Sequence, residues 1–218
     1  MISNLHSSYI NSIDIKVFDL EESKTAIHVF QEFSNDQYGL ENIDIKETDT
    51  VIDVGANIGI FSIYVKKKFN CKVISFEPVP DIFELFKKNI ELNGLSLSDF
   101  QIHNKAITSE AGNVIKIGTP YDNSGGSSKF YKTNWKINEC ITETLDNYLN
   151  IRCKYLKIDC EGSEYEIIPS IIDKINNIEN IGIEYHKIDN SPNNPVELHK
   201  LLKEKFKGKM YTNINFHV

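Results

Sequence analysis

Two short segments of the chain place acidic residues and a histidine where strands are expected to end. The segment L-K-I-D-C-E-G-S-E contains Lys157, Asp159 and Glu161, and the segment I-E-Y-H ends in His186. Strand alternation puts Lys157 and Asp159 on one face, and charged side chains inside a buried strand cost free energy unless they are paired or used. Imidazoles and carboxylates can take a proton from a hydroxyl group. We therefore predict that His186, Asp159 and Glu161 are catalytic, with His186 as the better match to a general base at neutral pH.

Two other interpretations of this cluster stay open. In the first, Lys157 and Asp159 form a structural ion pair, and a glutamate caps the helix that follows. In the second, Asp159 and Glu161 bind a divalent cation, which would lower the pKa of a bound hydroxyl group. The sequence fixes no third ligand for such a cation. A metal is therefore not the favoured interpretation, and no metal ligand is assigned.

A turn containing glycine follows an earlier apolar run, V-I-D-V-G-A-N-I-G, at residues 51–59. Gly55 and Gly59 let the backbone turn tightly and approach a ligand closely, and the next helix offers free N–H groups at its start. Glu77 lies 18 residues beyond Gly59, where Rossmann-like folds place an acidic residue that binds ribose hydroxyls. The pattern predicts a cofactor that contains a nucleoside, and the carboxylate would repel the 2′-phosphate of NADP.

Alternating strands and helices are expected to position these residues. Apolar runs predict main strands at residues 50–54, 71–76, 100–107, 155–160 and 181–185, shorter strands at 113–118 and 136–143, and a closing strand at 210–218. Helices are predicted at residues 58–68, 81–92, 163–175 and 195–206. This order predicts an α/β fold with a mostly parallel central sheet and helices on both faces. Residues 1–50, with a strand at 13–17 and a short helix that ends near Phe33, form an N-terminal extension packed on the domain of residues 51–218.

Composition and charge narrow the partners. The net charge is −7, whereas nucleic-acid binding draws most of its affinity from basic residues, so no nucleic-acid partner is expected. No run reaches the roughly 18 apolar residues of a membrane span. The four cysteines include no C-x-x-C pair, which argues against a zinc site and favours a cytoplasmic protein with reduced thiols.

The ordered motifs resemble the FkbM family of methyltransferases that use S-adenosylmethionine (SAM). The matching pieces, in order, are V-I-D-V-G-A-N-I-G, F-E-P-V-P, N-S-G-G-S-S, T-L-D-N-Y-L, L-K-I-D-C-E-G-S-E and I-E-Y-H, which span residues 51–186. Cys160 and Ser163 stand where family members often have valine and alanine. The resemblance implies a Rossmann-like class I methyltransferase sheet with an antiparallel strand at its C-terminal edge. It also implies that SAM is bound by Asp53, Gly55, Asn57, Gly59 and Glu77, with Asn104 and Ala106 near the adenine.

The expected activity is O-methylation of a hydroxyl group on a sugar, a glycan or a secondary metabolite, with S-adenosylhomocysteine as the product. One alternative is an NAD-dependent oxidoreductase, although the G-x-x-x-G spacing differs from the G-x-G-x-x-G of dinucleotide-binding proteins. A second is a base-modifying nucleic-acid methyltransferase, but D-C-E-G stands where those enzymes carry an N-P-P-aromatic motif. A third is a non-catalytic SAM-fold binding subunit. The acceptor is expected to be a small molecule or saccharide, and a homodimer stays open.

Overall fold

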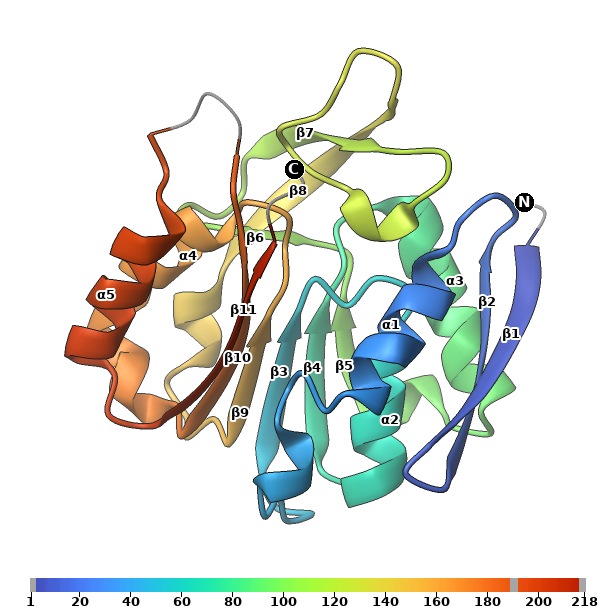
Figure 1. Ribbon diagram of the computed structural model, residues 1–218, viewed down its shortest axis with the longest axis horizontal. Helices are drawn as coiled ribbons and strands as arrows, with labels where there is room; N and C mark the ends of the chain where they lie inside the picture. The colour runs from blue at the N-terminus through green and yellow to red at the C-terminus, as the bar shows by residue number, and fades with distance from the viewer. Residues whose placement is uncertain (1–2, 189–191, 216–218) are drawn as a thin grey trace.

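The centre of the molecule is a parallel sheet (Figure 1). The computed structural model describes residues 3–188 and 192–215. Within them the sheet has six strands in the order β11 (Lys209–Asn215), β10 (Asn180–His186), β9 (Tyr155–Ile158), β3 (Thr50–Val54), β4 (Lys72–Phe76) and β5 (Phe100–His103). Every neighbouring pair is parallel. The carboxyl ends of all these strands therefore meet at one edge, which confirms the predicted α/β architecture.

Helices cover both faces of the sheet (Figure 1). On one face lie α1 (Thr25–Ser34), α2 (Ile60–Phe69) and α3 (Pro80–Leu92), and on the other lie α4 (Glu164–Ser170) and α5 (Pro195–Lys205). Side-chain alternation divides the core accordingly: Val51 and Val73 pack with the first set of helices, and Ile52 and Ile74 pack with the second. Both faces of these strands are buried, as expected for a parallel sheet.

A second, smaller sheet lies beyond the carboxyl ends of the central strands (Figure 1). It consists of β6 (Ala106–Thr108), β8 (Lys136–Thr144) and β7 (Val114–Thr119), in that order. The strand predicted at residues 100–107 is therefore two strands in two sheets. The chain turns at Asn104, whose side chain donates hydrogen bonds to the carbonyl groups of Glu77 and Pro78, both at 2.9 Å. Short 3₁₀ turns complete the fold at Leu40–Asn42, Leu97–Asp99, Ser124–Gly126, Leu145–Tyr148 and Ile172–Asn177.

The C-terminal edge strand corrects one expectation. The resemblance implied an antiparallel strand at this edge, but β11 pairs parallel to β10 from Asn180–Lys209 to His186–Asn215. The reason lies in the connection between them. Helix α5 carries the chain back along the sheet, so that β11 starts at the same end as β10, and a helical crossover of this kind joins parallel strands.

The N-terminal extension contains a hairpin followed by α1. The predicted strand and short helix are confirmed as β2 (Ile13–Leu20) and α1. A further strand, β1 (Ser3–Ile10), pairs antiparallel to β2 through a turn at Asn11 and Ser12. Both turn residues have positive φ, 47° and 68°, as two-residue hairpin turns of this twist require.

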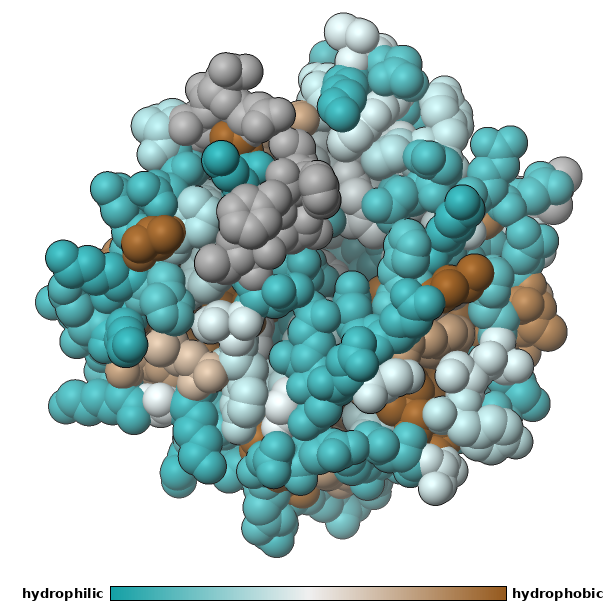
Figure 2. Space-filling view, viewed as in Figure 1, coloured by the Kyte–Doolittle hydropathy of each residue, from teal (hydrophilic) through white to brown (hydrophobic). Residues whose placement is uncertain are grey.

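The outer surface of the viewed face is predominantly hydrophilic, with hydrophobic residues gathered beside α1 and the hairpin (Figure 2). Among the described residues no helix combines the length and the apolar character needed to cross a bilayer. All four cysteines are free thiols.

Candidate active site

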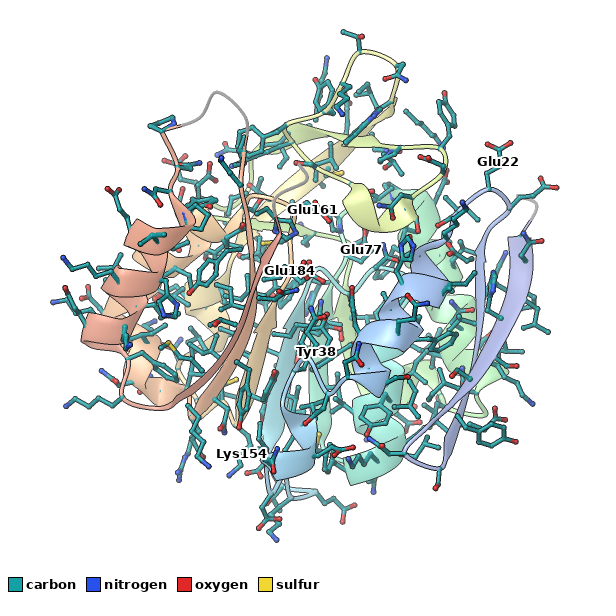
Figure 3. The ribbon with its side chains drawn as sticks, in the orientation of Figure 1. Glu22, Tyr38, Glu77, Lys154, Glu161 and Glu184 are labelled. Atoms are coloured by element: carbon teal, nitrogen blue, oxygen red, sulfur yellow. The ribbon has the colours of Figure 1, made fainter. Side chains whose placement is uncertain are left out.

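A cavity of about 190 Å³ lies where β3, β4, β9 and β10 end. Six of the residues predicted at the site line it: Gly55, Asn57, Glu77, Ala106, Asp159 and Glu161. Four others lie outside its lining: Asp53, Gly59, Asn104 and His186. Figure 3 shows Glu77, Glu161 and Glu184 directed toward the same central region of the molecule. The carboxyl-end edge therefore brings together both predicted groups, the glycine turn and the acidic cluster.

The glycine turn after β3 depends on backbone shapes that few residues adopt. Gly55 has φ +81°, and a Cβ atom there would lie 1.8 Å from the carbonyl oxygen of Asp159. Asn57 follows with φ 50°, and Gly59, with φ +92°, begins α2 against the ring of Phe86. Glycine at position 55 is therefore required both by its φ and by the close approach of the β9 tip.

Glu77 closes the cavity at the end of β4. Its carboxylate accepts hydrogen bonds from the backbone N–H groups of Asn57, at 2.8 Å, and Val79, at 2.9 Å. The side chain is only 4% exposed. Burial raises the pKa of Glu77 to about 7, although the two N–H groups act in the opposite direction. These contacts fix the carboxylate in the wall of the cavity, where its remaining lone pairs can accept further hydrogen bonds.

Asp53 lies beneath the cavity floor. Its carboxylate accepts a hydrogen bond from Ser62 Oγ at 2.6 Å and lies 3.2 Å from Lys157 Nζ. Lys157 also donates to the carbonyl of Gly55 at 2.9 Å and lies 3.5 Å from Asp159. Burial alone would lower the pKa of Lys157, but Asp53 and Asp159 outweigh it and raise that pKa. The structural ion pair left open by the sequence is therefore present, and it includes Asp53, which holds the turn from below.

His186, Asp159 and Glu161 form one cluster, as predicted. His186 Nε2 lies 3.8 Å from Asp159 Oδ1 and 3.6 Å from Glu161 Oε1. Its other ring nitrogen, Nδ1, lies 3.2 Å from Glu164 Oε1. Glu161 has φ 52°, an uncommon conformation for a residue other than glycine and one that often occurs at functional sites. His186 lies behind the two carboxylates, which themselves line the cavity.

The electrostatics of the cluster differ from the prediction for His186. Burial opposes its charge, but the hydrogen bond to Glu164 and the charges of Glu161 and Asp159 raise the pKa of His186 to about 10. The imidazole therefore holds its proton at neutral pH in the ligand-free protein, and its predicted match to neutral pH is wrong. Burial, opposed by His186 and reinforced by the neighbouring carboxylates, raises the pKa of Glu161 to about 8.

Two further carboxylates at the cavity were missed from the sequence. Glu184 is a residue of β10 and accepts a hydrogen bond from Gln37 Nε2 at 3.3 Å. Glu32 comes from α1, and burial together with the charges of Asp159 and Glu184 raises its pKa to about 8. Glu184 was detectable, because alternation places it on the same face as His186, two residues on. Glu32 had no such signal, since only the fold brings α1 to this edge.

The match to known proteins agrees with this arrangement. The model of the methyltransferase FkbM domain matches residues 53–208, which is well over half of the chain. The chain belongs to the FkbM methyltransferase family. The matched range contains all of the residues predicted at the site.

Proteins similar to this chain occur in fungi and in a bacterium. Methyltransferase 1 of Beauveria bassiana is 27% identical over 57% of this chain and 59% of its own length. Methyltransferase sdnD of Sordaria araneosa is 32% identical over 38% of this chain and 31% of its own. The AMB antimetabolite synthetase AmbE of Pseudomonas aeruginosa is 35% identical over 33% of this chain and 4% of its own. The chain thus spans about three fifths or less of each of these relatives.

Proposed function

We propose that this chain is a SAM-dependent methyltransferase that methylates a hydroxyl group. The observation that carries the proposal is a single cavity with two chemically different ends. At one end Glu77 and the glycine turn offer a carboxylate and a close backbone, which suit the ribose of a nucleoside. At the other end Asp159 and Glu184 offer carboxylates. The donor set fits SAM, whose sulfonium and ammonium groups are cationic.

The residues of the chain divide the work as follows. Gly55, Asn57, Glu77 and Ala106 hold the nucleoside, and Asp53 supports the turn through Lys157. When bound, SAM supplies a methyl group made electrophilic by its positive sulfur.

The acceptor hydroxyl has to lose a proton, and Glu161 and Asp159 are the carboxylates of the catalytic cluster that reach the cavity. His186 lies behind them, with Nε2 at 3.6 and 3.8 Å from their oxygens. Holding two reactants in line can supply ~7–11 kcal/mol of the barrier, and a positioned base roughly 10²–10⁴-fold. Placement of the acceptor therefore matters at least as much as the base.

A serine-rich wall of the cavity, which contacts the acidic cluster through Ser128 and the carbonyl group of Glu161, supports an acceptor rich in hydroxyl groups. The segment of residues 123–128 brings the side chains of Ser124, Ser127 and Ser128 to the cavity. Ser127 and Ser128 donate to the carbonyl groups of Ser124 and Glu161, so their oxygens keep lone pairs that can accept hydrogen bonds from the hydroxyls of a sugar. We infer a sugar, glycan or hydroxylated secondary metabolite as the acceptor, modified in the cytoplasm.

Calorimetric titration tests the cofactor assignment. SAM and S-adenosylhomocysteine should bind the wild-type protein with micromolar dissociation constants, and Glu77→Ala should weaken both at least tenfold (~1.4 kcal/mol). NAD serves as the competing ligand. Binding of NAD without binding of SAM would support the oxidoreductase alternative, and a folded wild-type protein that binds neither SAM nor its product would overturn the proposal.

A further inference from the structure

The imidazole of His186 presents one ring nitrogen to the acidic cluster without a hydrogen bond. The side chain is 1% exposed, and Nε2 has no hydrogen-bond partner among the described residues. The nearest carboxylate oxygens, from Glu161 and Asp159, lie at 3.6 and 3.8 Å, beyond hydrogen-bonding distance. A buried ring nitrogen surrounded by carboxylates at this range leaves room for an ion between them.

Glu164 fixes the orientation of that ring. The side chain is fully buried, and its Oε1 accepts the backbone N–H of His186 at 2.6 Å, while its Oε2 accepts the backbone N–H of Gly162 at 2.9 Å. His186 Nδ1 lies 3.2 Å from the same Oε1. Since Glu164 is an acceptor here, Nδ1 carries a proton toward it, and Nε2 becomes the ligand nitrogen when a bound cation displaces its proton. Metal-binding histidines commonly have this carboxylate partner on the second nitrogen.

Three side chains supply ligand atoms at one point. One donor atom each from Asp159, Glu184 and His186 lies within 4.8 Å of the other two. A cation with ligand bonds of about 2.0–2.2 Å separates donors by roughly 3–4.4 Å, so the set has to contract around the ion when it binds. We propose that Asp159, Glu184 and His186 bind a divalent first-row transition-metal ion at the acidic end of the cavity. Two carboxylates and one imidazole suit Mn²⁺, Fe²⁺ or Zn²⁺ better than Mg²⁺, which prefers oxygen ligands.

The ion would have a defined task, and this part of the inference rests on the proposed function. Glu161 lies beside the ligand set and lines the cavity. A divalent ion polarises an oxygen ligand and lowers the pKa of a bound hydroxyl. The ion would hold the acceptor oxygen, and its positive charge would favour the ionised form of Glu161, which receives the proton. The two carboxylates named in the sequence, Asp159 and Glu161, would then have different roles.

Metal binding is measured without SAM, so that the two proposals fail separately. Mn²⁺ is titrated into the metal-stripped protein, and the free ion is followed by electron paramagnetic resonance. We expect one site with a micromolar dissociation constant and at least tenfold weaker competition by Mg²⁺. Glu184→Gln and His186→Gln should each weaken Mn²⁺ binding at least tenfold. Pulsed spectra of the bound ion should show nitrogen coupling in the wild type, because an imidazole is a ligand.

The control variant is Glu32→Gln, which removes a carboxyl group from the same cavity without removing a ligand. It should weaken Mn²⁺ binding less than about threefold. Circular dichroism shows whether each variant folds. The nitrogen coupling is measured on the wild type, so it tests the site even where a variant fails to fold. Millimolar binding, absence of nitrogen coupling, or equal losses in Glu32→Gln and Glu184→Gln would each overturn the site. Methyl transfer would then have to proceed without this ion.

Discussion

The ammonium group of Lys157 lies 3.2 Å from Asp53 Oδ1, and the two side chains are only 4% and 0% exposed. The same nitrogen donates to the carbonyl of Gly55 at 2.9 Å and lies 3.5 Å from Asp159. One buried cation thus joins β3, the glycine turn and the tip of β9. The cavity floor is held by charge as well as by packing.

Replacement of Lys157 by methionine should therefore destabilise the protein strongly. The variant leaves Asp53 buried without its cation, and breaking a buried pair in this way costs ~3–5 kcal/mol. Urea denaturation followed by circular dichroism gives the free energy of unfolding. The matched control is Lys154→Met, at the opposite end of the sheet (Figure 3), where the side chain is 20% exposed and paired with Glu179. Lys154→Met should lower the free energy of unfolding by less than ~1 kcal/mol. Equal decreases in the two variants would show that the buried pair of Lys157 and Asp53 contributes no more than a surface pair.

Alanine at Gly55 should also be costly, because two penalties add there. The position has φ +81°, and a Cβ would lie 1.8 Å from the carbonyl oxygen of Asp159. Gly94 has a similar φ, +72°, but no atom lies within 4 Å of a Cβ built there. We expect Gly94→Ala to cost ~1–2 kcal/mol for the left-handed backbone alone and Gly55→Ala to cost several kcal/mol more. Thermal unfolding of both variants measures the difference, which would vanish if β9 could move away freely.

Much of this site was predictable from the sequence because it depends on local patterns. A buried apolar run followed by glycine locates a strand tip, and parallel strands bring their tips to one edge. Glu77, Asp159 and Glu161 were found in this way. The same alternation that puts Lys157 and Asp159 on one face also puts Glu184 and His186 on one face. Glu184 could therefore have been predicted from the sequence.

Other features depend on contacts that no local pattern records. The direction of β11 follows from the path of α5 across the sheet. The alternation of residues within a strand does not show whether the strand pairs parallel or antiparallel to its neighbour. The sequence of β1 is too polar to predict a strand, and its conformation depends on its pairing with β2. The pKa of His186 reflects Glu164, Glu161 and Asp159 together, and their distances come from the fold.

The affinity for S-adenosylhomocysteine should depend on pH through Glu77. Its pKa in the ligand-free fold is about 7, raised from 4.5 by burial, and only the ionised carboxylate can accept hydrogen bonds from both ribose hydroxyls. Lowering the pH from 8 to 6 should weaken binding about tenfold, as the ionised fraction of a group with this pKa falls. Calorimetric titration across this range provides the measurement.

The control for this dependence is Glu77→Gln, which should bind S-adenosylhomocysteine weakly at every pH. The same pH dependence of affinity in both proteins would assign the titration to another group.

The stability of the ligand-free protein should change with pH in the opposite sense. A folded pKa above the unfolded one favours the protonated fold, so this stabilisation is present below pH 4.5 and is lost as the pH rises through about 7.

Asp19 connects the N-terminal extension to the serine-rich wall of the cavity. It is fully buried in β2, and it accepts hydrogen bonds from Ser124 Oγ at 3.2 Å and the backbone N–H of Ala26 at 3.0 Å. Asp19→Ala leaves the N–H of Ala26 without its acceptor and removes one of the two acceptors of Ser124 Oγ, the other being Thr25 Oγ1. This should cost ~1–3 kcal/mol and loosen the segment of residues 123–128. Limited proteolysis with mass spectrometry should then show faster cleavage in that segment, and thermal unfolding should show the loss of stability.

The control is Asp14→Ala in the same hairpin, where the carboxylate forms a partly exposed ion pair with Lys16 at 3.3 Å. Such surface changes usually stay within ~0.5 kcal/mol, and cleavage at residues 123–128 should not change. If Asp19→Ala behaves like Asp14→Ala, the serine wall is held by its own turn at Asn123. If only Asp19→Ala accelerates cleavage, the extension is part of the site, because it sets the position of a segment that lines the cavity.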